Sequence, residues 1–225
     1  MRRPEPWFRL AEFALRPPAA LWFNWRFEGI EHIPPEGPLL VAANHISYFD
    51  PLAHGFMLLK AGRRPRFLAK SELYGNPFMS RLLKGANQIR VDRGTRSPAP
   101  VQAALKALKR DEAVVIYPEG TVTKNPDSTP MQAKTGIARI ALTSEVPVLP
   151  MAVWGSQHVW QRDGARSLEF GRPIWVKAGP PMDFSEYEVR RDDPQALREV
   201  TDAIMGDVSR LVTNLRTRYP KRWEA

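Results

Sequence analysis

Short apolar runs alternate with stretches of helical periodicity along most of the chain after residue 29. This alternation is typical of α/β proteins, whose strands form a sheet with helices packed on its faces. The apolar runs predict strands at Pro38–Ala43, Arg66–Lys70, Gln88–Val91, Ala113–Tyr117, Val148–Val153 and Ile174–Lys177. The periodic stretches predict helices at Pro51–Lys60, Pro77–Lys84, Pro98–Arg110, Lys134–Thr143 and Pro194–Arg218. No repeat or low-complexity linker divides them, so we expect one domain with an N-terminal appendage.

The N-terminal appendage is amphipathic. On a helix over Trp7–Arg16, the aromatic and aliphatic side chains share one arc and the charged side chains lie opposite. A Pro-Pro pair ends this helix, and Ala19–Trp25 forms a second short apolar segment. The aromatic density and the surrounding arginines favour helices that lie among lipid headgroups, the alternative being helices packed on the domain. We therefore assign residues 1–25 to amphipathic membrane-anchoring helices and residues 26–225 to the main domain.

No stretch of the sequence predicts a membrane span. The longest uncharged run, Val146–Gln161, has 16 residues and includes polar side chains, whereas a spanning helix needs about 20 mostly apolar residues. The N-terminus also lacks the continuous apolar core of a signal peptide. We expect a peripheral protein on the cytoplasmic face of the cell membrane.

The amino-acid composition excludes several kinds of site and partner. The chain of 225 residues has no cysteine, which excludes disulfides, cysteine-ligated metals and thiol catalysis. Its formal net charge is +9, and the segment from Lys60 to Arg93 carries nine basic residues against two acidic ones. Such charge suits a nucleic acid, a membrane or an anionic metabolite. No nucleic-acid-binding motif accompanies it, so we expect no nucleic-acid partner.

One segment has the residues of a general base. The apolar run ending at Ala43 is followed by Asn44 and His45, and Asp50 comes five residues after the histidine. A neutral imidazole takes a proton from an attacking hydroxyl best when a carboxylate holds its other nitrogen. Open α/β sheets place their sites at the carboxyl ends of strands, where this pair falls.

Two further segments carry charge at expected strand ends. The run Val114–Thr121 ends in Pro-Glu-Gly-Thr, which places Glu119 at the mouth of the sheet and Gly120 where a ligand can approach the backbone. The segment Gly85–Gly94 ends in Asp92 and Arg93, and Lys70 ends an earlier strand. Arginine and lysine are the side chains that bind phosphate.

Together these motifs resemble the glycerolipid acyltransferase family, specifically bacterial 1-acylglycerol-3-phosphate acyltransferases. Asn44-His45-x4-Asp50 resembles its first block, Gly85…Asp92-Arg93 its second, Pro118-Glu119-Gly120-Thr121 its third and Val146-Pro147-Val148-Leu149-Pro150 its fourth. The blocks occur in family order, and the resemblance runs from about Phe27 to about Val176. It implies an open mixed sheet flanked by helices, preceded by a membrane-anchoring helix pair.

The resemblance also implies roles. His45 would be the general base, oriented by Asp50, and would activate the sn-2 hydroxyl of lysophosphatidic acid to attack an acyl thioester. Lys70 and Arg93 would hold the acceptor phosphate, while Glu119, Gly120 and Thr121 would shape the acceptor pocket. The thioester would come from acyl-CoA or acyl carrier protein as a substrate, with no metal and no cofactor.

One departure leaves the acceptor open. Many family members follow Glu-Gly-Thr with arginine, whereas this chain has Val122, so the phosphate contact is absent or supplied by Lys124 or Lys134. Another lysophospholipid, an aminolipid or a glycolipid is therefore an alternative acceptor. A non-catalytic protein that binds anionic membranes or nucleic acid is a further alternative, against which the intact histidine–aspartate pair argues.

Two smaller expectations remain. The cluster Arg63, Arg64 and Arg66 suits either an acidic carrier protein or the phosphates of CoA, so the donor is open. His54, four residues after Asp50 on an expected helix, is expected to be packed or exposed and not a second base.

Overall fold

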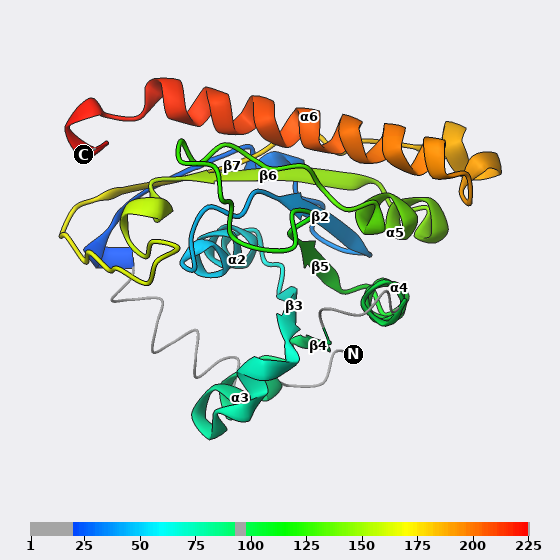
Figure 1. Cartoon of the computed structure of the whole chain (residues 1–225), viewed down its shortest axis with the longest axis horizontal. Helices are drawn as coiled ribbons and strands as arrows, with labels where there is room; N and C mark the ends of the chain where they lie inside the picture. Colours follow the sequence, from blue (N-terminus) through cyan, green and yellow to red (C-terminus); the bar gives the residue numbers. More distant parts are fainter. Residues whose placement is uncertain (1–19, 93–97, 225) are drawn as a thin grey trace.

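A seven-stranded sheet is the centre of the molecule (Figure 1). The computed structural model describes residues 20–92 and 98–224. The strands lie in the order β1-β7-β6-β2-β5-β3-β4. Their bounds are Asn24–Glu28 (β1), Leu39–Ala43 (β2), Pro65–Lys70 (β3), Ile89–Val91 (β4), Ala113–Ile116 (β5), Val148–Trp154 (β6) and Pro173–Ala178 (β7).

The sheet is mixed and open. Every pair of neighbouring strands is parallel except β6 and β7, which are antiparallel. Strand β2 lies between β5 and β6, with Val41 opposite both Val115 and Leu149. Because the carboxyl ends of parallel strands share one edge, the loops after β2 and β5 meet there. The expected α/β class with an open mixed sheet is confirmed.

Helices cover both faces of the sheet. Figure 1 shows the long helix α6 across one face, with α5 beside it, and α2 on the opposite face. The helices are Asp50–Lys60 (α2), Pro77–Gly85 (α3), Ala99–Leu108 (α4), Gly136–Ser144 (α5) and Pro194–Arg218 (α6). Short 3-10 turns lie at Ile30–His32, Ser71–Gly75, Ser156–His158, Ser185–Arg190 and Lys221–Trp223.

The central strands are buried because helices cover them on both faces. All residues of β2, β5 and β6 are buried, which explains why the sequence shows them as continuous apolar runs and not as alternating strands. Helix α6 begins as its sequence predicts: the Asp193 carboxylate accepts from the N–H of Gln195 at 3.0 Å, and Pro194 occupies the first turn.

The first strand corrects the expected domain boundary. Asn24–Glu28 forms β1, which pairs in parallel with β7, so Asn24 and Trp25 belong to the sheet and not to an anchoring helix. Phe23 is buried in the core, where its ring meets that of Phe49 at 5.2 Å. Residues Ala20–Trp22 are helical. The rest of the expected anchor, residues 1–19, lies outside the described residues.

Within residues 20–92 and 98–224, no helix combines the length and the apolar character needed to cross a bilayer.

Candidate active site

The histidine–aspartate pair is assembled at the carboxyl end of β2. His45 lies in the loop after β2, and Asp50 is the first residue of α2. The Nδ1 atom of His45 and Oδ2 of Asp50 are 2.9 Å apart. With Asp50 holding Nδ1–H, the lone pair of His45 resides on Nε2, which is the nitrogen able to take a proton. The sequence prediction that these two residues meet is therefore confirmed.

Hydrogen bonds hold both carboxylate oxygens of Asp50. It is fully buried, and its Oδ2 also accepts from the backbone N–H groups of Ile46 at 2.6 Å and Ser47 at 2.8 Å. Its Oδ1 accepts from the hydroxyl of Ser156 at 2.6 Å. A buried charge needs such partners. Ser156 follows β6, 106 residues away along the chain, and nothing in the sequence pointed to it.

Asn44 holds the start of the loop after β2 against β6. Its side-chain Nδ2 donates to the carbonyl of Val153 at 3.0 Å, and its Oδ1 accepts from the N–H of Val153 at 2.8 Å. The carbonyl of His45 accepts from the N–H of Thr123 at 2.7 Å. These bonds fix the backbone on both sides of the histidine, so its ring has little freedom to leave Asp50.

Tyr117 packs flat against the ring of His45. The two ring centroids are 4.1 Å apart, with an angle of 17° between the planes. The Tyr117 hydroxyl lies 3.1 Å from Nδ1 of His54, which is fully buried. His54, which was expected to be either packed or exposed, is packed, and burial lowers its pKa to about 4, which keeps it neutral. Burial also raises the pKa of Tyr117 well above its ordinary value. Tyr117 was not among the predicted site residues.

Glu119 connects the two loops of the site. Its Oε1 accepts from the N–H of His45 at 3.0 Å, and its Oε2 accepts from the N–H of Met131 at 2.9 Å. Burial raises the pKa of Glu119, and the two backbone donors oppose that rise. Since both oxygens hold protein amides, the geometry gives Glu119 an ordering role.

A pocket of about 240 Å³ opens beside this loop. Its polar side is formed by Asp92, Gly120 and Lys134, and Tyr117 lines it as well. Its apolar wall comes from β3–β5, α4 and α5, through Leu68, Val91, Val101, Val115, Ile116, Ile137 and Ile140. Tyr117 thus lines the pocket and also packs against the ring of His45.

The backbone at Gly120 lies close to the ammonium group of Lys134. Gly120 has a φ of +77°, and a Cβ there would lie 3.5 Å from Nζ of Lys134. Lys134 lines the pocket, whereas Lys124 does not. Val122 is 2% exposed, so its side chain is part of the interior. Of the two lysines expected to replace the missing arginine, the structure favours Lys134.

The structure describes only some of the residues that were predicted to bind the acceptor. Lys70 is exposed at the end of β3, where it lies in register with Val91 of β4. Arg93 lies outside the described residues. Thr121 is half-buried in the loop after β5, next to Gly120.

Two arginines of the basic segment are structural. Arg63 is 1% exposed, and its guanidinium donates to the carbonyls of Pro34, Glu36 and Gly37. Arg66 is also buried and donates to the carbonyl of Ala86. The expectation that these two arginines meet a carrier protein or CoA is therefore wrong. Sequence charge alone did not distinguish buried arginines from exposed ones.

The fold and the site define an α/β protein with a histidine–aspartate pair beside a pocket at the carboxyl ends of its strands. The chain belongs to the Acyltransferase family, whose family model matches residues 24–154. That match begins at the first residue of β1 and ends at the last residue of β6.

Named relatives agree with this membership. The chain is 28% identical over 146 residues to the 1-acyl-sn-glycerol-3-phosphate acyltransferase of Bacillus subtilis, covering 64% of this chain and 70% of the relative. It is 32% identical over 176 residues to the bovine 1-acyl-sn-glycerol-3-phosphate acyltransferase alpha, covering 76% of this chain and 58% of the relative. Matches to several other curated relatives also span less than two thirds of the relative, down to 39%.

A solved structure has a similar fold. The crystal structure of the 1-acyl-sn-glycerophosphate (LPA) acyltransferase PlsC from Thermotoga maritima aligns with a TM-score of 0.69 and 28% sequence identity. The alignment covers 96% of this chain and 81% of that chain.

Proposed function

We propose that this protein transfers a fatty acyl group from acyl-CoA, or from acyl carrier protein, to the sn-2 hydroxyl of lysophosphatidic acid, giving phosphatidic acid. The family membership and the names of the relatives support this substrate class. The observation that carries the chemistry is the buried Asp50 carboxylate on Nδ1 of His45.

The proposed reaction is a direct transfer. Nε2 of His45 takes the proton of the acceptor hydroxyl as the hydroxyl oxygen forms a bond to the thioester carbonyl carbon. The carbon–sulfur bond then breaks, and the leaving thiolate takes the proton back from the imidazolium. Asp50 stabilises the imidazolium between these steps, and a positioned base of this kind contributes about 10²–10⁴-fold. No metal or cofactor enters this scheme.

The pocket suits an acceptor that combines phosphate with an apolar chain. Lys134 supplies positive charge beside Gly120, and the wall formed by β3–β5, α4 and α5 is apolar. Lys70 and Arg93 are proposed as further phosphate ligands.

Another lysophospholipid is the second candidate acceptor. Val122 is buried at the position where the family resemblance led us to expect an arginine, so this position supplies no charged phosphate contact. A headgroup with a further substituent on its phosphate would tolerate that loss better. Comparing lysophosphatidic acid with lysophosphatidylglycerol at equal chain length separates the two candidates.

The test of the function is thiol release. Purified protein is given acyl-CoA or acyl carrier protein with each lysophospholipid, and wild type is compared with His45→Ala. We expect the substitution to lower turnover at least 10²-fold. His32→Asn is the matched control, because His32 bonds the carbonyl of Ala178 away from the pair and should leave turnover unchanged. Absence of thiol release by wild type with every donor and acceptor refutes the proposal.

We also propose that the protein works at the cytoplasmic face of the cell membrane, with membrane lipids as its partners. The amphipathic sequence of residues 1–19 supports this proposal. A deletion that tests it should end at residue 19, because Phe23 is in the core and Asn24 begins β1. We expect the shortened protein to fold and to co-sediment with anionic liposomes much less than wild type does. Equal sedimentation would contradict the anchor.

A further inference from the structure

Four apolar side chains gather on the surface at one end of the sheet. Leu21, Trp22, Leu168 and Phe170 are 78%, 45%, 63% and 69% exposed, and we refer to them as the apolar patch. Two segments of the chain build it together: Nε1 of Trp22 donates to the carbonyl of Leu168 at 2.9 Å, and the rings of Trp22 and Phe170 meet edge to face at 5.6 Å. Scattered exposed apolar residues need no explanation, whereas a joined group indicates a partner.

The patch is ordered. Two of its residues, Leu168 and Phe170, lie in the connection between β6 and β7, whose residues 161–170 are all exposed. Within this connection the N–H of Gln161 donates to the carbonyl of Ala165 at 2.8 Å, and the N–H of Ser167 donates to the carbonyl of Val159 at 3.0 Å. The apolar side chains are therefore held outward by a hydrogen-bonded loop.

Further aromatic side chains and an arginine lie on the β6–β7 connection and on the loop after β2 that this connection contacts. The Arg166 guanidinium lies 4.0 Å above the ring of Trp160, and the rings of Trp160 and Tyr48 are 5.6 Å apart. Tyr48 is 48% exposed. Aromatic rings with a polar tip, accompanied by arginine, are enriched where a bilayer meets water.

The patch is also connected to the site. The hydroxyl of Ser47 donates to the carbonyl of Trp160 at 2.6 Å, and the N–H of Ser47 donates to Asp50 at 2.8 Å. The connection that carries Leu168 and Phe170 thus contacts the loop that carries His45. A protein docked through this patch holds its catalytic loop close to the docking surface.

The position of the patch in the chain favours a bilayer as its occupant. Residues 1–19 directly precede it and contain Trp7, Phe8 and four arginines, so a lipid-binding sequence enters the fold at this point. An anionic bilayer suits both these arginines and Arg166.

We infer that the apolar patch inserts into the headgroup region of an anionic bilayer, so that the β6–β7 connection is a membrane-contact loop of the folded domain. The inference rests on the proposed function only in that a lipid substrate brings the protein to a bilayer. Contact through the folded domain, and not only through residues 1–19, fixes which way the pocket faces the lipid.

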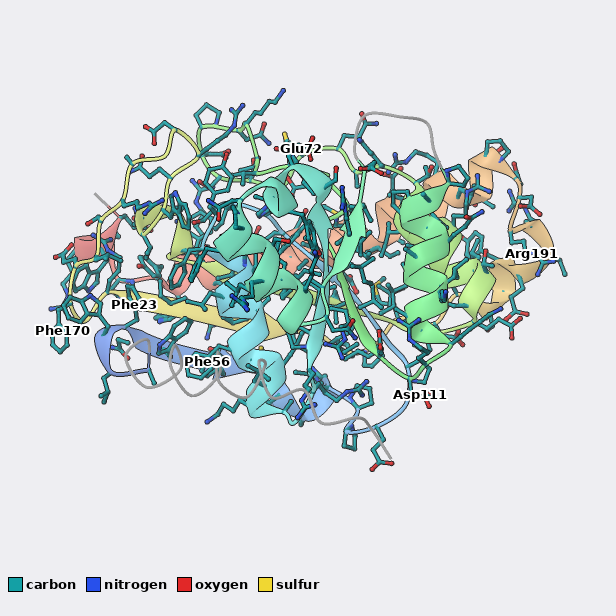
Figure 2. The ribbon with its side chains drawn as sticks, turned by 90° about the horizontal axis from the view of Figure 1, so that it is seen from below. Phe23, Phe56, Glu72, Asp111, Phe170 and Arg191 are labelled. Atoms are coloured by element: carbon teal, nitrogen blue, oxygen red, sulfur yellow. The ribbon has the colours of Figure 1, made fainter. Side chains whose placement is uncertain are left out.

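Because the chain has no cysteine, one introduced cysteine gives a clean probe. Leu168→Cys is labelled with a polarity-sensitive dye in the full chain. The matched control is Val189→Cys, since Val189 is 94% exposed and lies near Arg191, at the opposite end of the molecule from Phe170 (Figure 2). Vesicles of phosphatidylcholine and phosphatidylglycerol, without substrate, are then added. We expect a blue shift with a severalfold rise in emission at position 168 and no change at position 189.

Each other outcome overturns the inference. A label at position 168 that is already blue-shifted without vesicles, and does not respond to them, shows that another part of the chain covers the patch. No response at either position shows that the patch stays in water, and equal responses show that docking is not specific to it. As a second measure, Leu168→Asp with Phe170→Asp should weaken vesicle binding at least tenfold, and Val189→Asp should not. Vesicle binding does not depend on turnover, so a failed acyl transfer leaves this test intact.

Discussion

Replacing Asp50 with asparagine removes the charge beside His45 and keeps the shape of the side chain. The asparagine oxygen can still accept from Nδ1 of His45 and from the N–H groups that Oδ2 binds now. Its NH₂ group would face the hydroxyl of Ser156, which is able to accept a hydrogen bond. The substitution therefore isolates the electrostatic contribution of the carboxylate.

The magnitude follows from the distance. Opposite unit charges about 4 Å apart attract by about 4 kcal/mol at an effective dielectric constant of about 20. The donors around Asp50 already stabilise its charge, so we expect the transition state to lose about 3 kcal/mol. Because about 1.36 kcal/mol corresponds to one decade of rate, kcat/KM should fall about 10²-fold.

Thiol release measures this loss, and urea unfolding verifies that the variant is folded. Asp202→Asn is the control, since Asp202 is an exposed partner of Arg198 on α6 and should leave kcat/KM unchanged. Asp50→Ala should in addition lower the free energy of unfolding by about 2 kcal/mol or more, because it leaves buried N–H groups without acceptors. A folded Asp50→Asn variant within threefold of wild type would refute the electrostatic reasoning.

Three further predictions concern Tyr117, His54 and Arg63. Tyr117→Leu should lower kcat by about threefold to thirtyfold in the same assay, because it removes the ring that faces the imidazolium of His45, while Tyr117→Phe should retain most activity; equal losses in both would contradict this. Between pH 6.5 and about 4 the unfolded chain binds a proton at His54 that the native chain does not, so the free energy of unfolding should fall by about 3 kcal/mol as the pH drops through this window. Urea unfolding of His54→Leu should lack that part of the pH dependence. Arg63→Met should lower the free energy of unfolding by about 3 kcal/mol or more, because it leaves the carbonyls that Arg63 binds without donors, with little change in turnover per folded molecule.

The sequence predicted every strand except β1, and the signal was clearest where burial is uniform or a helix is capped. Strands β2, β5 and β6 are buried at every residue and therefore appear as apolar runs, and α6 has both a cap and a periodic stripe. Strand β1 was different, because its aromatic residues resembled those of the preceding segment. Its partner, β7, is about 150 residues away, and no local signal reports such a pairing.

The sequence also predicted only part of the candidate site. His45 and Asp50 are close in sequence, so their spacing was enough to predict their contact. Ser156 and Tyr117 reach the pair from β6 and β5, and only the order of strands in the sheet brings them there. The burial of Arg63 was equally hidden, since a guanidinium that binds backbone carbonyls has the same charge in the sequence as one that binds a ligand.

Glu119 has a consequence for kinetics. One carboxylate joins the backbone of His45 to that of Met131, so a movement of the segment between β5 and α5 also moves the backbone of His45. A displacement of that segment by an arriving acceptor is transmitted to the histidine backbone through a bond at each end. Substitutions in the segment should therefore change both turnover and affinity for the acceptor. No residue of the segment should affect acceptor affinity alone.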